Sequence, residues 1–318
     1  MLPTMRESDL LASILRDPPP LGHGDAAGAR LDIGPGDDLA QLTFPGGQSV
    51  LIGVDQVVDG VHVDSRSQSW HGIARKAVHR CVSDVAAMAA RPIASVISVT
   101  FPADCTQDDA EMLRRGLGDT AADAGAPLVG GDIAVHAAAG PLTISVTVLA
   151  VPGDHGVVRR DGAQVGDGIW VSGQLGATMD ASGGGHHLAF MPRTDVAAAL
   201  HAHLGADLHA MIDISDGLGR DAGRIAAASQ VGIELDATSV PCRGSASWRA
   251  ALGDGEDYEL CFAAAADAQV PSSMDSVALT QVGRVVAGSG IVVVTPEGER
   301  LDGADLGWDH DGRSGDTS

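Results

Sequence analysis

The chain has 318 residues, which is enough for about two domains that each bury a core of their own. Its composition, 44% hydrophobic and 19% charged, is typical of a folded globular protein and excludes a largely disordered one. The formal net charge is −22 and Lys76 is the only lysine, so neither nucleic acid nor anionic lipid is expected as a partner.

The cysteines and the apolar stretches indicate the compartment. Cys81, Cys105, Cys242 and Cys261 form no C-x-x-C pair, which favours reduced thiols in the cytoplasm. The apolar stretch 142–151 is far shorter than the roughly 20 residues that span a bilayer. The N-terminus also lacks a basic region followed by an apolar one, so we expect a cytoplasmic protein without a membrane partner.

A helix followed by a strand is predicted within the first half of the chain, after a strand at 50–54. Apolar residues within 73–88 recur at helical spacing, and Arg91-Pro92 ends the run before a strand-like segment at 93–100. Thr106 can cap a second helix, which is predicted to reach about residue 124.

A further strand and a domain boundary follow. Residues 127–131 lead to Asp132, and 142–150 has the pattern of a strand. Pro152-Gly153 is the candidate boundary, which divides the chain into domains at 1–151 and 152–318.

The second half mixes strands and helices without a strict alternation. Strands are predicted at 168–173, 258–263 and 291–295, a loop at 182–187, and a helix directly after Gly217. This order favours an α+β architecture over a doubly wound parallel sheet.

Short aspartate motifs beside glycines carry the chemical signal. Divalent cations such as Mg²⁺ prefer oxygen ligands, and glycine lets a backbone approach a phosphate closely. A single Gly-Asp pair is more often a turn than a ligand, so the signal lies in the set. The motifs are Gly36-Asp37-Asp38, Asp55, Ser83-Asp84, Gly130-Gly131-Asp132, Asp213-x-x-Asp216 and Gly255-Glu256-Asp257.

Asp84 is the most informative of these residues. Its spacing from Ala77, Cys81 and Met88 places it on the helix stripe that faces the core. An ionised carboxylate there requires a cation, which is either a metal ion or a neighbouring arginine. Asp213 and Asp216 precede a helix, so one of them could instead cap its amide groups.

The signatures that the sequence lacks narrow the chemistry. It has no G-x-x-x-x-G-K-[ST] loop, no H-R-D or D-F-G kinase motif and no G-x-G-x-x-G. Polyphosphate charge would then be neutralised by metal ions held on aspartates, helped by arginines such as Arg160. The pairs His186-His187 and His201-x-His203 lack zinc-site spacing and are interpreted as surface or loop histidines.

Read in order, these motifs resemble the thiamine-monophosphate kinases of the aminoimidazole-ribotide-synthetase-like superfamily. The similarity covers most of the chain, and its GEDYEL element separates this family from its superfamily relatives. The motifs that carry it are GPGDDLA at 34–40, GVDQVVDGVHV at 53–63, VSDVAAMAA at 82–90, LVGGDI at 128–133, MIDISDGL at 211–218 and GEDYEL at 255–260.

The resemblance implies a site, position by position. It places ATP against Gly131, Asp132, Arg160 and Ser215. It places thiamine monophosphate against His62, Glu256 and Trp308, although Trp308 could instead seal the second domain. The implied Mg²⁺ ligands are Asp38, Asp55, Asp84, Asp132, Asp213 and Asp216.

The resemblance also implies an architecture and a reaction. The first domain would bind ATP and Mg²⁺ and form a homodimer, and the second, α+β domain would complete the active site. The enzyme would phosphorylate thiamine monophosphate to thiamine diphosphate with ATP. No general base is implied, because a phosphate monoester is already largely dianionic at neutral pH.

Three departures from the family pattern leave alternatives open. Gly53-Val54 replaces hydroxyl residues that could ligate metal, Asp254 replaces a glycine, and the segment 176–187 is short. One alternative is another ATP-using superfamily member that performs cyclisation or cofactor assembly. The other is a degenerate protein that binds nucleotide or thiamine phosphates without turnover.

Overall fold

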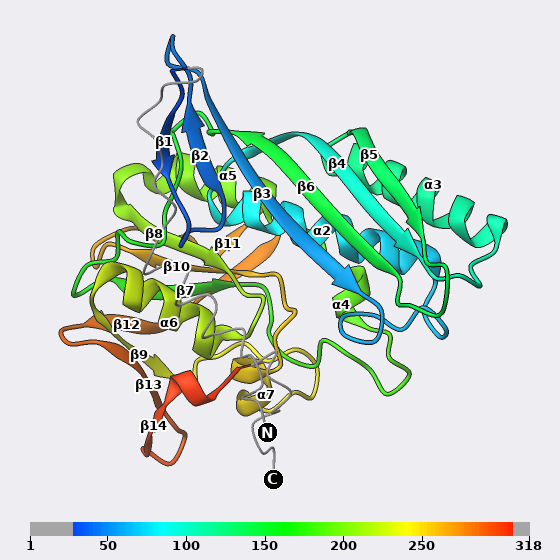
Figure 1. Ribbon diagram of the computed structural model, residues 1–318. Coiled ribbons are helices and arrows are strands. Elements are labelled where there is room, and N and C mark those ends of the chain that lie inside the picture. Colours follow the sequence, from blue (N-terminus) through cyan, green and yellow to red (C-terminus); the bar gives the residue numbers. More distant parts are fainter. Residues whose placement is uncertain (1–27, 308–318) are drawn as a thin grey trace, which may run out of the picture.

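The computed structural model describes residues 28–307, and its first half is a sheet covered on one face by two helices (Figure 1). The strand order is β1-β2-β3-β6-β4-β5, with β4 and β5 parallel and the other neighbours antiparallel. The strands are β1 (Arg30–Ile33), β2 (Ala40–Thr43), β3 (Ser49–Val58), β4 (Arg91–Phe101), β5 (Leu128–Val135) and β6 (Thr143–Val151). The helices are α2 (Trp70–Ala87) and α3 (Gln107–Asp123).

The second half is built on a larger, mostly antiparallel sheet. Its order is β14-β13-β9-β12-β7-β10-β8, with β11 paired to β12. Among the described strands of this second sheet, only β13 and β9 are parallel. The strands are β7 (Gly168–Ser172), β8 (Leu208–Asp213), β9 (Gly232–Asp236), β10 (Leu260–Ala264), β11 (Ser273–Met274), β12 (Val277–Val286), β13 (Gly290–Val294) and β14 (Arg300–Asp302). The helices are α4 (His186–Ala189), α5 (Thr194–Leu204), α6 (Leu218–Ser229) and α7 (Trp248–Gly253), with short 3₁₀ turns at Gly205–Asp207 and Gly303–Asp305.

The two predicted helices of the first half are confirmed, and so is the predicted cap at Thr106. The Ser69 hydroxyl accepts a hydrogen bond from the amide of Gly72 and starts α2. Thr106 and Asp109 form a reciprocal capping box at the start of α3, as the sequence indicated. The mixed helix and strand content confirms the α+β class.

Three local predictions were wrong or incomplete. Residues 128–131 belong to strand β5, which was not predicted. Every residue of this edge strand is exposed, so it shows no alternation of buried and exposed positions. The loop at 182–187 gives way to α4 from His186 onward. The strand predicted at 258–263 begins only at Leu260, because Glu256 and Tyr258 have positive φ angles of 57° and 51°.

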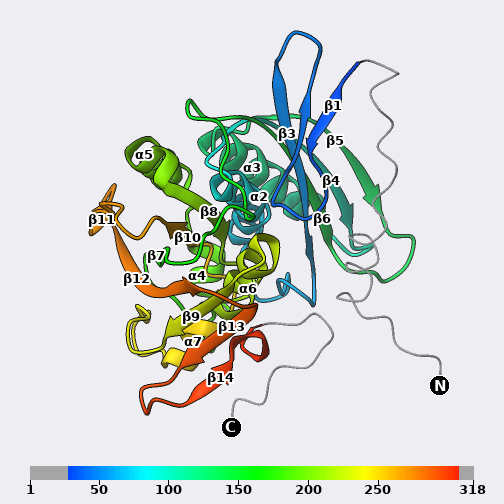
Figure 2. The same ribbon diagram turned by 90° about the vertical axis from the view of Figure 1, so that its left-hand side faces the viewer.

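Helix α2 lies where the two halves meet. It packs on β3, β4 and β6 of the first sheet and on α4, α5 and β8 of the second half. Figure 2 shows α2 between the first sheet and the strands of the second. Its apolar side chains are therefore buried on both sides, as the zero exposure of Ile73 and Val85 illustrates. No helix among residues 28–307 is long and apolar enough to cross a bilayer.

Lys76 on α2 is completely buried and holds segments from both halves. Its Nζ donates to the carbonyl oxygen of His62 at 2.6 Å and lies 2.6 Å from Glu256 Oε1 and 3.0 Å from Nδ1 of His187. Burial opposes the charge of Glu256, but His187 and Lys76 hold the pKa of this carboxyl well below its usual range.

We expect Lys76→Met to lower the free energy of unfolding by about 2 to 4 kcal/mol, because it removes the cation that contacts Glu256 and leaves this carboxylate with His187 alone. The double variant Lys76→Met/Glu256→Gln should regain a large part of this loss, since no buried charge then lacks a partner. Urea unfolding measures both. The control is Arg115→Met on α3, whose ion pair with Glu111 is exposed and should contribute little. Equal losses in the single and double variants would contradict the role of the ion pair.

Candidate active site

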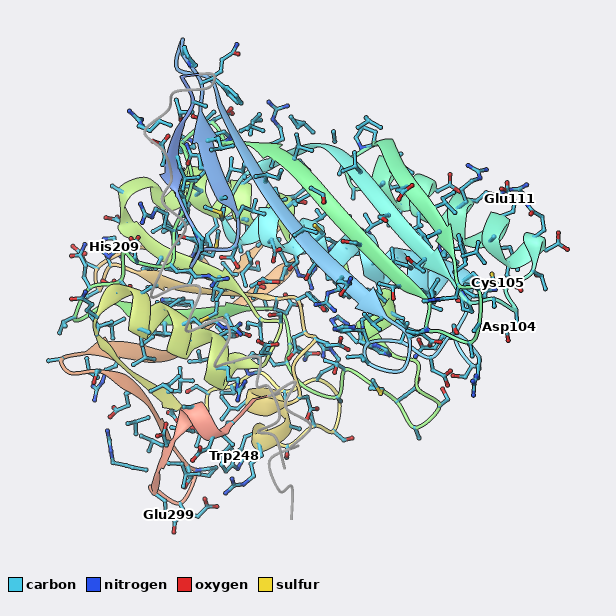
Figure 3. The ribbon with its side chains drawn as sticks, in the orientation of Figure 1. Asp104, Cys105, Glu111, His209, Trp248 and Glu299 are labelled. Atoms are coloured by element: carbon cyan, nitrogen blue, oxygen red, sulfur yellow. The ribbon has the colours of Figure 1, made fainter. Side chains whose placement is uncertain are left out.

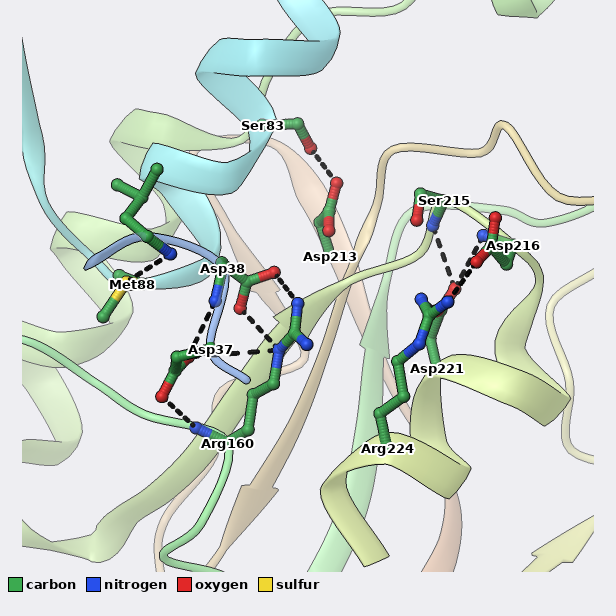
Figure 4. A network of polar contacts seen from close by, with 11 residues as sticks. Asp37, Asp38, Ser83, Met88, Arg160, Asp213, Ser215, Asp216, Asp221 and Arg224 are labelled. Carbon is green, nitrogen blue, oxygen red and sulfur yellow. Dashed lines mark hydrogen bonds and ion pairs between the residues drawn. The ribbon is translucent and has the colours of Figure 1, made fainter. Parts of the chain in front are cut away.

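Three carboxylates converge where the two halves meet. Asp38 lies between β1 and β2, Asp84 lies on α2, and Asp213 is the last residue of β8. One oxygen of each lies within 4.8 Å of the others, and theirs is the only such group of metal-ligating side chains among residues 28–307. Figure 4 shows Asp38 bonded to Arg160, and Asp213 bonded to Ser83 of α2. Oxygen ligands at this separation suit a divalent cation such as Mg²⁺.

The electrostatics of this group require a counter-charge. Burial raises the pKa of Asp84 well above its usual range, and the neighbouring carboxylates of Asp55, Asp213 and Asp38 raise it further. Burial and Asp38 also raise the pKa of Asp213, although the Ser83 hydroxyl donates to its carboxylate at 2.6 Å. A bound cation would relieve this repulsion and let all of them ionise.

Arg160 supplies part of that charge. Its Nε and Nη2 donate to the two carboxylate oxygens of Asp38 at 3.0 and 2.5 Å (Figure 4). Asp37 fixes the same loop, because it accepts from the amide of Asp38 at 3.0 Å and from that of Arg160 at 3.4 Å. The buried side chain of Leu39 anchors the loop in the first core.

Asp84 itself has no arginine partner. None of the ion pairs formed within 28–307 includes it, so the salt bridge considered from the sequence is absent from the described part of the chain. The arginine one turn earlier, Arg80, instead contacts Asp55 on β3, with Nε and Nη2 at 3.1 and 3.3 Å from its two oxygens. Asp55 thus lies outside the converging group although it is an electrostatic neighbour of Asp84.

The turn before α6 is organised by a residue that the sequence reasoning missed. Asp221 accepts from the amides of Ser215 and Asp216 at 3.0 and 2.9 Å, so neither Asp213 nor Asp216 caps this helix. Arg224 pairs with both Asp216 and Asp221 (Figure 4). The sequence signal that could have identified Asp221 is its spacing of three residues from Arg224 in the first turns of the helix.

Gly131 and Asp132 lie on the edge strand β5, away from the converging group. The register pairs Gly131 with Ile97 and Asp132 with Ser98, so the two residues point to opposite faces of the sheet. A Cβ at Gly131 would lie 2.0 Å from the carbonyl oxygen of Ile97, which explains the glycine. Both residues line an open cavity of about 820 Å³ between β4, β5 and α3. Cys105 and Glu111, labelled in Figure 3, also line it.

The residues assigned to substrate are only partly grouped. His62 and Glu256 meet through Lys76, which binds the carbonyl oxygen of the first and the carboxylate of the second. The side chain of Glu256 keeps 24% exposure, so it still reaches solvent. Trp308 lies outside the described residues.

The segments around GEDYEL are held by further contacts. Arg243 pairs with Asp257, and Asp254 accepts from the amide of Ala177 at 2.8 Å, so the departure at position 254 has a structural contact. Tyr258 stacks on Phe190 with ring centroids 3.9 Å apart.

Two of the histidines interpreted as surface or loop residues are in fact buried. His187 is fully buried and contacts Lys76, and His201 keeps 8% exposure on α5. His186 contacts the carbonyl oxygen of Asp257 at 2.9 Å. Neither pair belongs to a metal-ligating group within the described residues.

Comparisons with known proteins agree with this architecture. Family models for the N-terminal and C-terminal domains of AIR synthase related proteins match residues 36–151 and 162–295. Thiamine-monophosphate kinase of Rhodopirellula baltica is 34% identical over 290 residues, which cover 85% of this chain and 89% of the relative.

Solved structures also show a similarity to thiamine-monophosphate kinases. AaThiL complexed with AMPPCP and TMP superimposes with a TM-score of 0.76 at 26% identity, covering 96% of this chain and 99% of the other. Thiamine-monophosphate kinase from Stenotrophomonas maltophilia K279a has a TM-score of 0.66 at 30% identity, with coverages of 92% and 96%. The chain therefore belongs to the thiamine-monophosphate kinase family of the AIR synthase related proteins.

Proposed function

We propose that the protein transfers the γ-phosphoryl group of ATP to the phosphate of thiamine monophosphate, giving thiamine diphosphate and ADP. Two findings support this reaction: the relatives bear that name over most of the chain, and the similar AaThiL structure holds AMPPCP and TMP. The observation that carries it in this molecule is the convergence of Asp38, Asp84 and Asp213. A transfer between two polyanions needs positive charge, which a metal ion held by these three carboxylates would supply.

The proposed centre holds Mg²⁺ on these carboxylates. When bound, the ion would neutralise phosphate oxygens and orient them for in-line transfer. The carboxylates position the ion, Ser83 orients Asp213, and Arg160 orients Asp38 beside the phosphates.

The remaining assigned ligands stay predictions. Asp55 and Asp216 are paired with Arg80 and Arg224, and Asp132 lies on the β5 edge.

The residues assigned to the nucleotide and to the acceptor are part of the proposal. ATP is proposed to contact Gly131, Asp132, Arg160 and Ser215, and the β5 cavity has the size of a small-molecule pocket. Thiamine monophosphate is proposed to contact His62, Glu256 and Trp308. No side chain is assigned as a general base, because the acceptor phosphate is largely ionised at neutral pH.

The organisation of the chain is part of the proposal. We propose a domain at 1–151 that binds ATP and Mg²⁺ and forms the dimer, and a domain at 152–318 that completes the active site. The end of the first sheet at Val151 supports this division. A cytoplasmic location is likewise proposed, and it is compatible with the absence of a membrane-spanning helix in 28–307.

Release of ADP tests the reaction directly. We expect ADP to form from ATP and Mg²⁺ only when thiamine monophosphate is present, with thiamine diphosphate as the second product in equal amount. A coupled assay with chromatography of the products measures both. ADP formed without thiamine monophosphate would favour another superfamily reaction, and binding without any ADP would favour a degenerate binder.

Replacement of Asp84 tests the metal centre. We expect Asp84→Asn to lower kcat by about a hundredfold or more, because metal–phosphate contacts contribute several kcal/mol and each 1.36 kcal/mol is tenfold in rate. Asp119→Asn, on the exposed side of α3, is the control and should keep normal turnover. Near-normal turnover of a folded Asp84→Asn protein would move Asp84 to a structural role.

Light scattering tests the proposed homodimer. The outer face of the first sheet exposes Ile52, Val54 and Val96, and Val54 alone keeps 62% exposure, which supports an interface there. We expect a mass of twice 32.2 kDa at micromolar concentration. Val54→Glu should shift the protein to monomer, whereas Val165→Glu, equally exposed in the second half, should not. A monomeric wild-type protein with full activity would refute the homodimer.

A further inference from the structure

Asp55 and Asp38 each face an arginine, but in different settings. Both carboxylates accept from Nε and Nη2 of one guanidinium, that of Arg80 or that of Arg160. Asp38 also converges with Asp84 and Asp213, whereas Asp55 is not part of any converging group among residues 28–307. Arg80 is thus the only cation that the described structure brings into contact with Asp55.

The two residues before Asp55 offer no side-chain oxygen for a metal ion. The preceding residues are Gly53 and Val54, and the Val54 side chain points to the opposite, exposed face of the sheet. A Cβ at Gly53 would lie 2.3 Å from Cδ2 of the buried Leu39, so a hydroxyl side chain there would have to displace the core. A divalent ion at Asp55 would therefore have few ligands from this strand.

Arg80 is well placed to act as a permanent positive charge. It keeps 14% exposure and lies on α2, one turn before Asp84, and its guanidinium is held in place by the Asp55 carboxylate. Hydrogen bonds within the described residues engage Nε and Nη2 and leave Nη1 without a protein partner. A guanidinium held in this way can meet a phosphate oxygen as a metal ion would.

We propose that Arg80 is a built-in cation that replaces a divalent ion at Asp55. Resting on the proposed function, this means that divalent ions bind at Asp38, Asp84 and Asp213 but not at Asp55. The protein would then bind fewer divalent ions than a protein in which all the assigned carboxylates ligate metal. Arg80 cannot leave with the products, so this part of the positive charge is present in every turnover.

Mn²⁺ binding to the full chain, followed by electron paramagnetic resonance, tests the proposal without relying on activity. We expect Asp55→Asn to leave the Mn²⁺ affinity within about twofold of wild type, and Asp84→Asn to weaken it by about tenfold or more. Arg80→Gln frees the Asp55 carboxylate, so it should bind additional Mn²⁺, with lower affinity than the main centre because the strand supplies few other ligands. Arg80→Lys restores a positive charge and should return the number of ions to that of wild type.

Two outcomes would overturn the proposal, and they differ. A loss of Mn²⁺ affinity in Asp55→Asn as large as that in Asp84→Asn would show that Asp55 ligates the ion, while the metal centre itself stands. Unchanged affinity in Asp84→Asn would overturn the proposed centre and this inference together. If Arg80→Gln does not fold, the comparison of Asp55→Asn with Asp84→Asn still tests the proposal. Asp55→Asn should fold, because its side-chain amide keeps an oxygen that can accept a hydrogen bond from Arg80. Thermal melting confirms that each variant is folded.

Discussion

The placement of α2 between two sheets constrains the rest of the molecule. A helix buried on both sides can carry charges only where each meets a partner. Lys76, Arg80 and Asp84 are spaced by one turn, and they face Glu256, Asp55 and the carboxylates of Asp38 and Asp213. The two halves are therefore joined by electrostatic contacts as well as by apolar packing, and the same row of charges leads into the candidate site.

The site depends on this arrangement because its members come from distant parts of the chain. Asp38 and Asp213 belong to different halves, and Asp84 reaches both from the helix between them. Guanidinium groups balance part of the negative charge of the site's carboxylates: Arg160 pairs with Asp38, and Arg224 pairs with Asp216. Among the described residues, Asp84 and Asp213 form no ion pair with an arginine. A bound divalent ion would therefore stabilise the negative charge of these two carboxylates most.

Much of this could be predicted from the sequence, and the failures share a cause. The stripe containing Asp84 and the cap at Thr106 are local patterns, and the structure confirms both elements. The family motifs identified Asp38 and Asp213 as members of one site. Strand β5 was missed because an edge strand exposed on both faces has no alternation. The partners of Lys76 and Asp55 could not be predicted, because an ion pair between segments far apart in sequence leaves no periodic signal.

The complete burial of the only lysine has a practical consequence for the chemistry of the folded protein. Reagents that acylate side-chain amines need an accessible Nζ, and the Nζ of Lys76 is buried while it binds Glu256. Acylation at this residue would therefore measure how often α2 separates from the second half. The protein thus carries a single internal reporter of its own opening, at the contact on which the joining of its two halves depends.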